Sequence, residues 1–231
     1  VMNWEDVLYA ASVWTLPVLF AITLHEAAHG WVAWRLGDDT AYRLGRVSFN
    51  PLRHIDLFGT ILLPAMMLFA SGGRFMFGTA KPVPVNAVSL RNPRWGMVIV
   101  AAAGPLSNIL QALVAGFLLH GVVFLAGVDL QLWVGLNLEN AILINLWLAV
   151  FNMIPLPPLD GGRVAVGLLP AGLARPLAWL EKFGIVILLA TIFLIPWIAA
   201  QIGINLNPLE WLVAGPVTVL RFLALVITGW G

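Results

Sequence analysis

The chain has 231 residues, of which 61% are hydrophobic and only 10% are charged, and its formal net charge is +1. Ordinary soluble domains are about 45–50% apolar and about 25% charged, and a chain of this size cannot bury so much apolar surface in one soluble core. The composition therefore excludes a soluble globular enzyme and a disordered chain, and the small charge predicts no nucleic-acid partner. Cysteine is absent, so any metal must be held by His, Asp or Glu.

Six apolar stretches are candidates for membrane spans, since a spanning helix needs about 20 mostly apolar residues. The first follows acidic residues and is long, so we expect a retained helix and not a cleaved signal peptide. We predict an all-α polytopic membrane protein with about five to six transmembrane helices. The stretches cover residues 7–34, 55–70, 96–126, 132–154, 177–202 and 209–228.

The stretch 55–70 is short for a full crossing. It is followed by alternating residues with Gly and Pro, as in Phe75–Gly78 and Lys81–Val85, a pattern typical of a loop with short extended pieces. We expect 55–70 to dip into the bilayer and return with 73–88, as a membrane-embedded loop or short β-hairpin. Its extended pieces would then offer a strand edge to a bound peptide.

The basic residues predict the orientation of the helices. No Lys or Arg occurs in 1–34, 95–162 or 183–220. If the first helix runs inward and the later long spans alternate, 177–202 runs outward and 209–228 returns to the cytoplasm. Every cation is then on or near the cytoplasmic face, as the positive-inside rule requires.

Near the end of the first apolar stretch lies the sequence His25-Glu26-Ala27-Ala28-His29. Two His four residues apart lie on one helix face, one turn apart, and both can bind one zinc ion. Zinc lowers the pKa of bound water to about 7, and Glu26, beside the first ligand, can take its proton. The alternative is a helix end where His and Glu meet the membrane interface. However, ionisable residues after an apolar span are costly and favour a function.

A catalytic zinc ion usually has three protein ligands, and the best third candidate is Asp160. Prolines at 155, 157 and 158 end the preceding helix, and glycines at 161 and 162 permit a tight turn. The predicted topology places Asp160 on the same side of the membrane as the two His. The alternative is that Asp160 caps the short helix that follows it. His120, near the predicted outer end of its helix, and His54, in a polar loop, are weaker candidates.

Two asparagines have less specific signals. Asn108, one turn beyond Gly104, can donate a hydrogen bond to a developing oxyanion, or it can form a packing bond between helices. Asn152 can act similarly, or it can cap backbone groups that Pro155 leaves free. His54 is expected to be a supporting or interface residue and not a ligand.

Together these motifs resemble the site-2 protease family of intramembrane zinc metalloproteases. The resemblance rests on the residues from His25 to Gly30 and from Asn152 to Gly162, and on 45–56, 80–86 and 104–108, in the family's order. It implies one Zn²⁺ per chain, held by His25, His29 and Asp160, with Glu26 as the catalytic acid and base. It also implies cleavage of transmembrane segments near the cytoplasmic face.

The resemblance is to the minimal branch of the family, without PDZ or CBS domains. We expect one membrane domain over 1–231, with a catalytic core at about 5–165 and further helices at about 174–228, in a prokaryotic plasma membrane. The expected partners are transmembrane protein or peptide substrates, the lipid bilayer and a separate regulatory protein. The alternatives are a zinc transporter or metal sensor, disfavoured by the apolar outer halves of the spans, and a silent zinc-stabilised scaffold, disfavoured by Glu26.

Overall fold

The computed structural model describes residues 4–54, 56, 62, 66 and 81–231. All regular elements in this part of the chain are helices, and five helical segments are long and apolar enough to cross a membrane. Large apolar side chains are exposed along them, where lipid would contact the protein. The chain is therefore an all-α integral membrane protein, as predicted. The five segments are Trp4–Arg35, Pro93–Leu119, Val128–Asn152, Ala171–Gln201 and Pro208–Ile227.

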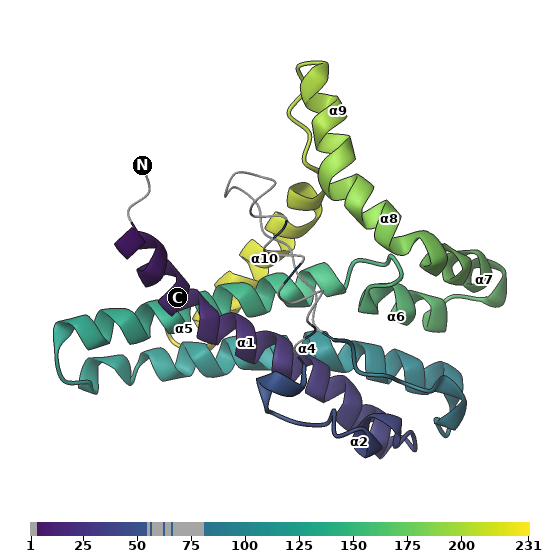
Figure 1. Ribbon diagram of the computed structural model, residues 1–231, viewed down its shortest axis with the longest axis horizontal. Helices are drawn as coiled ribbons and strands as arrows, with labels where there is room; N and C mark the ends of the chain where they lie inside the picture. Colours follow the sequence, from purple (N-terminus) through teal and green to yellow (C-terminus); the bar gives the residue numbers. More distant parts are fainter. Residues whose placement is uncertain (1–3, 55, 57–61, 63–65, 67–80) are drawn as a thin grey trace.

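Three helices form the central bundle (Figure 1). α1 (Trp4–Arg35) packs against α4 (Pro93–Leu119) and α5 (Val128–Asn152), and α4 and α5 run antiparallel. With 32 residues, α1 is about 48 Å long, so it extends beyond a hydrocarbon core of about 30 Å. Small side chains such as Ala101 and Ala112 are buried on α4 and allow the helices to approach closely.

The turn between α4 and α5 is longer than predicted. The helix expected over 96–126 ends at Leu119, and the chain passes through η4 (Val122–Phe124) before α5. Gly127 stands directly before α5 with φ of 90°, a conformation that glycine adopts without strain. This turn is apolar, so hydropathy alone did not separate it from the helix.

Short elements follow α1 at the end of the bundle nearest His29. They are α2 (Thr40–Arg43), η1 (Pro51–Arg53) and η3 (Ala87–Ser89). Most of the predicted re-entrant stretch and β-hairpin lies outside the described residues. Within the described part, 81–86 contains no strand: Pro82 and Pro84 have no N–H, and the Val83 N–H donates to a side chain of α1. This part therefore forms no open strand edge of the predicted kind.

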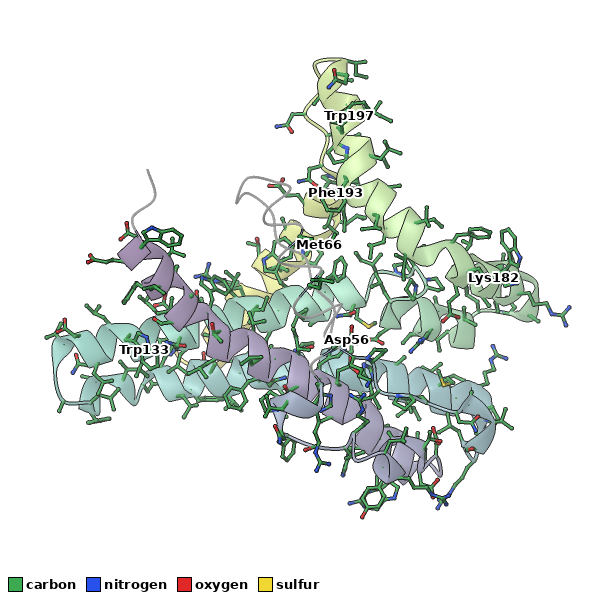
Figure 2. All side chains as sticks on the ribbon, in the orientation of Figure 1. Asp56, Met66, Trp133, Lys182, Phe193 and Trp197 are labelled. Atoms are coloured by element: carbon green, nitrogen blue, oxygen red, sulfur yellow. The ribbon has the colours of Figure 1, made fainter. Side chains whose placement is uncertain are left out.

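Beyond the proline-rich loop, α6 (Asp160–Leu168) packs against α4. The next five elements form one nearly continuous rod that leaves the bundle at an angle (Figure 1). Lys182 lies on the part of the rod near α7, and Trp197, 61% exposed, lies toward its far end (Figure 2). The rod consists of α7 (Ala171–Trp179), η5 (Leu180–Phe183), α8 (Gly184–Leu189), η6 (Ala190–Leu194) and α9 (Ile195–Gln201).

The last helix, α10 (Pro208–Ile227), packs against α5 and α4. Its C-terminal end lies at the C-terminal end of α4, because Trp230 Nε1 donates to the Gly116 carbonyl (2.9 Å) and His120 Nε2 donates to the Thr228 carbonyl (2.6 Å). α10 thus runs parallel to α4, toward the end of the bundle distal to α2. The predicted alternation made 209–228 run opposite to 96–126, and these contacts show that this prediction is wrong.

Packing in the half of the bundle distal to α2 explains why α10 runs in this direction. Here α4, α5 and α10 share an apolar core, and the exposed Arg221 lies on this half of α10. A single exposed arginine can extend along a helix to reach an interface, so it constrains direction weakly, whereas a packed apolar face does so strongly. The core consists of Ala112, Ala115, Ile142, Leu146, Val213, Val217 and Ala224.

Candidate metal centre

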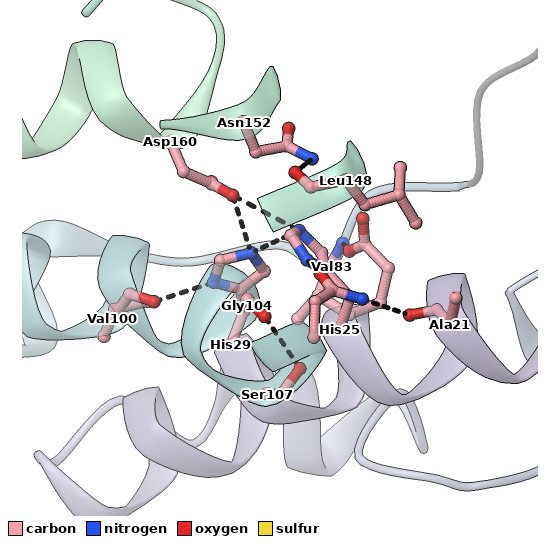
Figure 3. A network of polar contacts seen from close by, with 12 residues as sticks. Ala21, His25, His29, Val83, Val100, Gly104, Ser107, Leu148, Asn152 and Asp160 are labelled. Atoms are coloured by element: carbon pink, nitrogen blue, oxygen red, sulfur yellow. Dashed lines mark hydrogen bonds and ion pairs between the residues drawn. The ribbon is translucent and has the colours of Figure 1, made fainter. Parts of the chain in front are cut away.

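His25 and His29 lie one turn apart on the buried face of α1. Their exposed fractions are 7% and 8%, and their Nε2 atoms are 3.1 Å apart (Figure 3). The spacing of four residues places both rings over the same strip of the helix surface. The structure therefore brings the two imidazoles together as the sequence predicts.

The other nitrogen of each imidazole is held by α4. His25 Nδ1 is 2.6 Å from Asn108 Oδ1, and His29 Nδ1 is 2.7 Å from the Val100 carbonyl. Both partners are acceptors, so both Nδ1 atoms carry the hydrogen. In a neutral ring this arrangement leaves the lone pair on Nε2, which is the tautomer that a metal ligand needs.

Asp160 completes the cluster from the first turn of α6. Its Oδ2 lies 3.2 Å from His25 Nε2 and 3.3 Å from His29 Nε2 (Figure 3). The N-cap position of α6 is Leu159, without a side-chain capping bond. The contacts of Asp160 therefore favour the predicted ligand position over the capping alternative.

The glycines after Asp160 serve a different need from the one predicted. Gly161 and Gly162 are helical and do not form a turn of positive φ. A Cβ at Gly161 would lie 2.2 Å from the Met153 carbonyl oxygen, and one at Gly162 would lie 2.1 Å from Pro157 N. They allow α6 to lie against the proline-rich loop, and this contact places Asp160.

The donor set has the chemistry of a divalent-cation site. The Nε2 atoms of two imidazoles and a carboxylate oxygen meet in one buried cluster, and among the described residues Asp160 Oδ2 has no hydrogen-bond partner outside this cluster. Ligands at about 2.0–2.1 Å around a tetrahedral zinc ion stand about 3.3–3.4 Å apart. The observed separations of 3.1 to 3.3 Å are close to this spacing, so the residues fit zinc.

The charge state of Asp160 agrees with this role. Burial alone would raise the pKa of its carboxyl group, but the contacts with His25 and His29 outweigh burial and lower the pKa below its ordinary value. A lowered pKa favours the carboxylate form, which is the form that binds a metal ion. His25, His29 and Asp160 are the group of potential ligands that the described residues bring together.

Glu26 lies beside the cluster and outside it. Its side chain is half-buried, and Oε2 accepts a hydrogen bond from the Val83 N–H at 2.8 Å. The neighbouring position on α1 turns Glu26 away from the face that carries the two imidazoles. This placement separates a potential proton carrier from the potential ligands.

Asn108 is fully enclosed by protein. Its Nδ2 donates to the Ala21 carbonyl (3.2 Å) and to Asn145 Oδ1 (2.7 Å), while Oδ1 accepts from His25. Both amide hydrogens are used, so these contacts favour the packing alternative over the oxyanion alternative. Asn152 donates to the Leu148 carbonyl of its own helix, which is neither of its predicted roles.

The other two histidines lie apart from the cluster. His54 is buried, and its Nε2 donates to the Ser48 carbonyl at 2.9 Å. His120 lies at the distal end of α4, where it stacks on Trp230. Neither belongs to the ligand group that the described residues bring together.

Three further residues support the centre and were not predicted to do so. They are Val100 and Asn145, through the bonds given above, and Gly104. A Cβ at Gly104 would lie 2.3 Å from His29 Nε2, so the glycine makes room for the imidazoles. A carbonyl such as that of Val100 leaves no signal in a sequence.

Comparisons with known proteins identify the family of this chain. The model of peptidase family M50 matches residues 131–195. YwhC of Bacillus subtilis, named a candidate zinc metalloprotease, is 38% identical over 185 residues, covering 75% of this chain and 77% of YwhC. The chain belongs to peptidase family M50, the site-2 protease family.

Two more relatives of this family carry names of the same kind. Rip2 of Mycolicibacterium smegmatis, also named a candidate zinc metalloprotease, is 29% identical over 184 residues, covering 78% of this chain and 67% of Rip2. MJ0611 of Methanocaldococcus jannaschii, likewise named, is 43% identical over 65 residues, covering 28% of this chain and 31% of MJ0611. No solved structure gives a significant match.

Proposed function

We propose that this protein is an intramembrane zinc metalloprotease that hydrolyses peptide bonds in or near transmembrane segments of membrane proteins. The observation that carries the proposal is the meeting of His25, His29 and Asp160 inside an apolar helical bundle, with Glu26 at its edge. Family membership supports the same activity, because the relatives are named for zinc and proteolysis.

The three ligand side chains would hold the zinc ion and leave a fourth position for the reaction. Zinc bound there supplies Lewis acidity toward water and toward a peptide carbonyl. Glu26 takes a proton from the attacking water as the water oxygen bonds to the scissile carbonyl carbon. Glu26 then gives that proton to the departing amide nitrogen as the carbon–nitrogen bond breaks. Asn108 and the Val100 carbonyl hold the imidazoles in the required tautomer.

The position of the centre along α1 suits hydrolysis in a membrane. His25 lies ten residues before Arg35, the last residue of α1, so it is about 15 Å from that charged end. Cations at this end, at positions 35, 43, 46 and 53, favour the cytoplasmic side. Water then has a short path to the centre, and a substrate helix must unwind locally to expose its backbone.

The alternative of a zinc transporter lacks a second set of ligands. The distal half of the bundle has an apolar core, and the His, Asp and Glu of the described residues form no second ligand group there. Two asparagines of α5 in that half, Asn137 and Asn140, donate to backbone carbonyls, as expected for helix packing. The geometry therefore supports hydrolysis better than transport. Regulated proteolysis or peptide clearance, the prokaryotic plasma membrane and a separate regulatory protein remain predictions.

The test compares purified wild type with Glu26→Gln and Asp160→Ala on fluorescently labelled single-span membrane-protein fragments in micelles. We expect Glu26→Gln to keep one zinc ion per chain and to lose cleavage by at least about a hundredfold, because the proton carrier is gone. Asp160→Ala should lose zinc affinity and cleavage together. A wild type that binds zinc but cleaves none of the fragments, or a Glu26→Gln variant as active as wild type, would contradict the proposal.

A further inference from the structure

The segment 81–90 lies along α1 and is held by backbone amides. Lys81 N–H donates to the His54 carbonyl (2.9 Å), and Asn86 N–H donates to a carboxylate oxygen of Asp38 (2.6 Å). Asp38 is completely buried just beyond α1, where it also accepts two bonds from Thr40. The segment therefore has fixed attachments on both sides of Val83.

Val83 is anchored by its side chain as well. It is 7% exposed, and its Cγ1 lies 3.2 Å from the place where a Cβ on Gly30 of α1 would stand. Proline on each side of it restricts the backbone, because proline fixes its own φ and keeps the preceding residue extended. The Val83 amide is thus held in one orientation by its neighbours and by α1.

This amide is directed at the carboxylate of Glu26. It is the one N–H in the sequence Pro82-Val83-Pro84, and it lies 2.8 Å from Glu26 Oε2. Among the described residues, the Val83 N–H is the hydrogen-bond donor that contacts the Glu26 carboxylate. A hydrogen bond from an amide to a carboxylate is charge-assisted and directional, so it restricts the rotation of the glutamate.

We propose that the backbone amide of Val83 positions Glu26 for proton transfer. The inference rests on the proposed function, since a proton carrier must be held in reach of both water and the leaving nitrogen. Val83 acts through Glu26 and does not touch the reacting atoms. The Val83 amide is therefore a part of the active centre that works through the backbone, so a residue without an N–H at position 83 is incompatible with full activity.

The kinetic test is Val83→Pro, which removes the N–H but suits the extended backbone. Val85→Pro is the matched control, because it adds a proline to the same segment where the amide has no acceptor among the described residues. Val83→Ala keeps the N–H and removes side-chain atoms. We expect Val83→Pro to lower kcat about ten- to hundredfold with KM nearly unchanged and zinc retained. Val83→Ala should lose much less.

Two results would overturn the inference. One is a kcat for Val83→Pro equal to that of Val85→Pro. The other is loss of zinc from Val83→Pro in parallel with activity, which would assign the amide to the fold of the site and not to Glu26.

A second measurement does not depend on cleavage. In protein labelled with ¹⁵N-valine in micelles, Val83→Ala identifies the signal of the Val83 amide. We expect Glu26→Ala to shift this signal upfield and to speed its exchange with solvent, because its acceptor is gone. An unchanged shift and exchange rate would refute the contact. If wild type cleaves no substrate while this response is seen, the proposed function fails and the contact stands.

Discussion

Gly104→Ala tests whether the space between α1 and α4 is made for the two imidazoles. The new Cβ would lie 2.3 Å from His29 Nε2 and 2.6 Å from His25 Cε1. Ordinary contact begins near 3.4 Å, so the rings or the helix must move by about 1 Å. The rings are tied through their Nδ1 atoms to α4 itself, so a shift of α4 also moves their hydrogen-bond partners.

The expected size of the effect follows from this movement. Overpacking of a well-packed site costs about 1–3 kcal/mol, and a factor of ten in affinity corresponds to about 1.4 kcal/mol. We therefore expect Gly104→Ala to weaken zinc binding about ten- to hundredfold. Helix propensity acts in the opposite direction, since Ala is favoured over Gly by about 1 kcal/mol inside a helix. A loss of zinc without unfolding is thus the expected result.

The assay is competition for zinc with a chelator of known affinity in micelles, with helix content measured by circular dichroism. Gly215→Ala is the control, because Gly215 is an exposed residue inside α10 and its Cβ would have nothing within 4 Å. The control should bind zinc as wild type does. If Gly104→Ala also binds zinc and cleaves as wild type does, the proposed centre is not where these two histidines meet.

Two further substitutions test the supports of the centre. Asn108→Ala removes the acceptor of the His25 Nδ1 hydrogen, so zinc affinity should fall about ten- to hundredfold in the same competition assay. An unchanged zinc affinity would show that the imidazole needs no orienting partner. Arg94→Gln removes charged donors from the carbonyls at the C-terminal end of α6, whose first residue is Asp160. It should lower zinc affinity and the unfolding temperature, whereas Arg175→Gln, at an exposed position of α7, should change neither; equal behaviour of the two arginine variants would contradict this role.

Much of the site could be predicted from residue types and their spacing. His25, Glu26 and His29 were predicted because a helix of 3.6 residues per turn brings positions four apart to one face. Asp160 was predicted by chemistry, since a third ligand was needed and the chain has no cysteine. The structure brings Asp160 to the imidazoles from α6, which is more than 120 residues away along the chain.

The contacts that support the metal ligands and Glu26 could not be predicted in this way. The Val100 carbonyl and the Val83 amide are backbone groups, which every residue except proline offers in full, so no residue type marks them. Asn108 has both donor and acceptor atoms, and the sequence left its use open. Its neighbours in the packed bundle engage the whole amide, which favours packing over a role at an oxyanion.

The sequence by itself determined the membrane class, the long apolar helices and the pair of His on α1, because hydropathy and helical periodicity are local properties. The direction of α10 was decided by tertiary structure alone, through an apolar core shared with α4 and α5 and the contacts of Trp230 and Thr228. Long-range packing also decided which backbone groups face Glu26 and the imidazoles. The physical reason is that a lipid-facing helix is apolar in either direction, so its orientation and its partners depend on shape and on hydrogen bonds that form only when the helices meet.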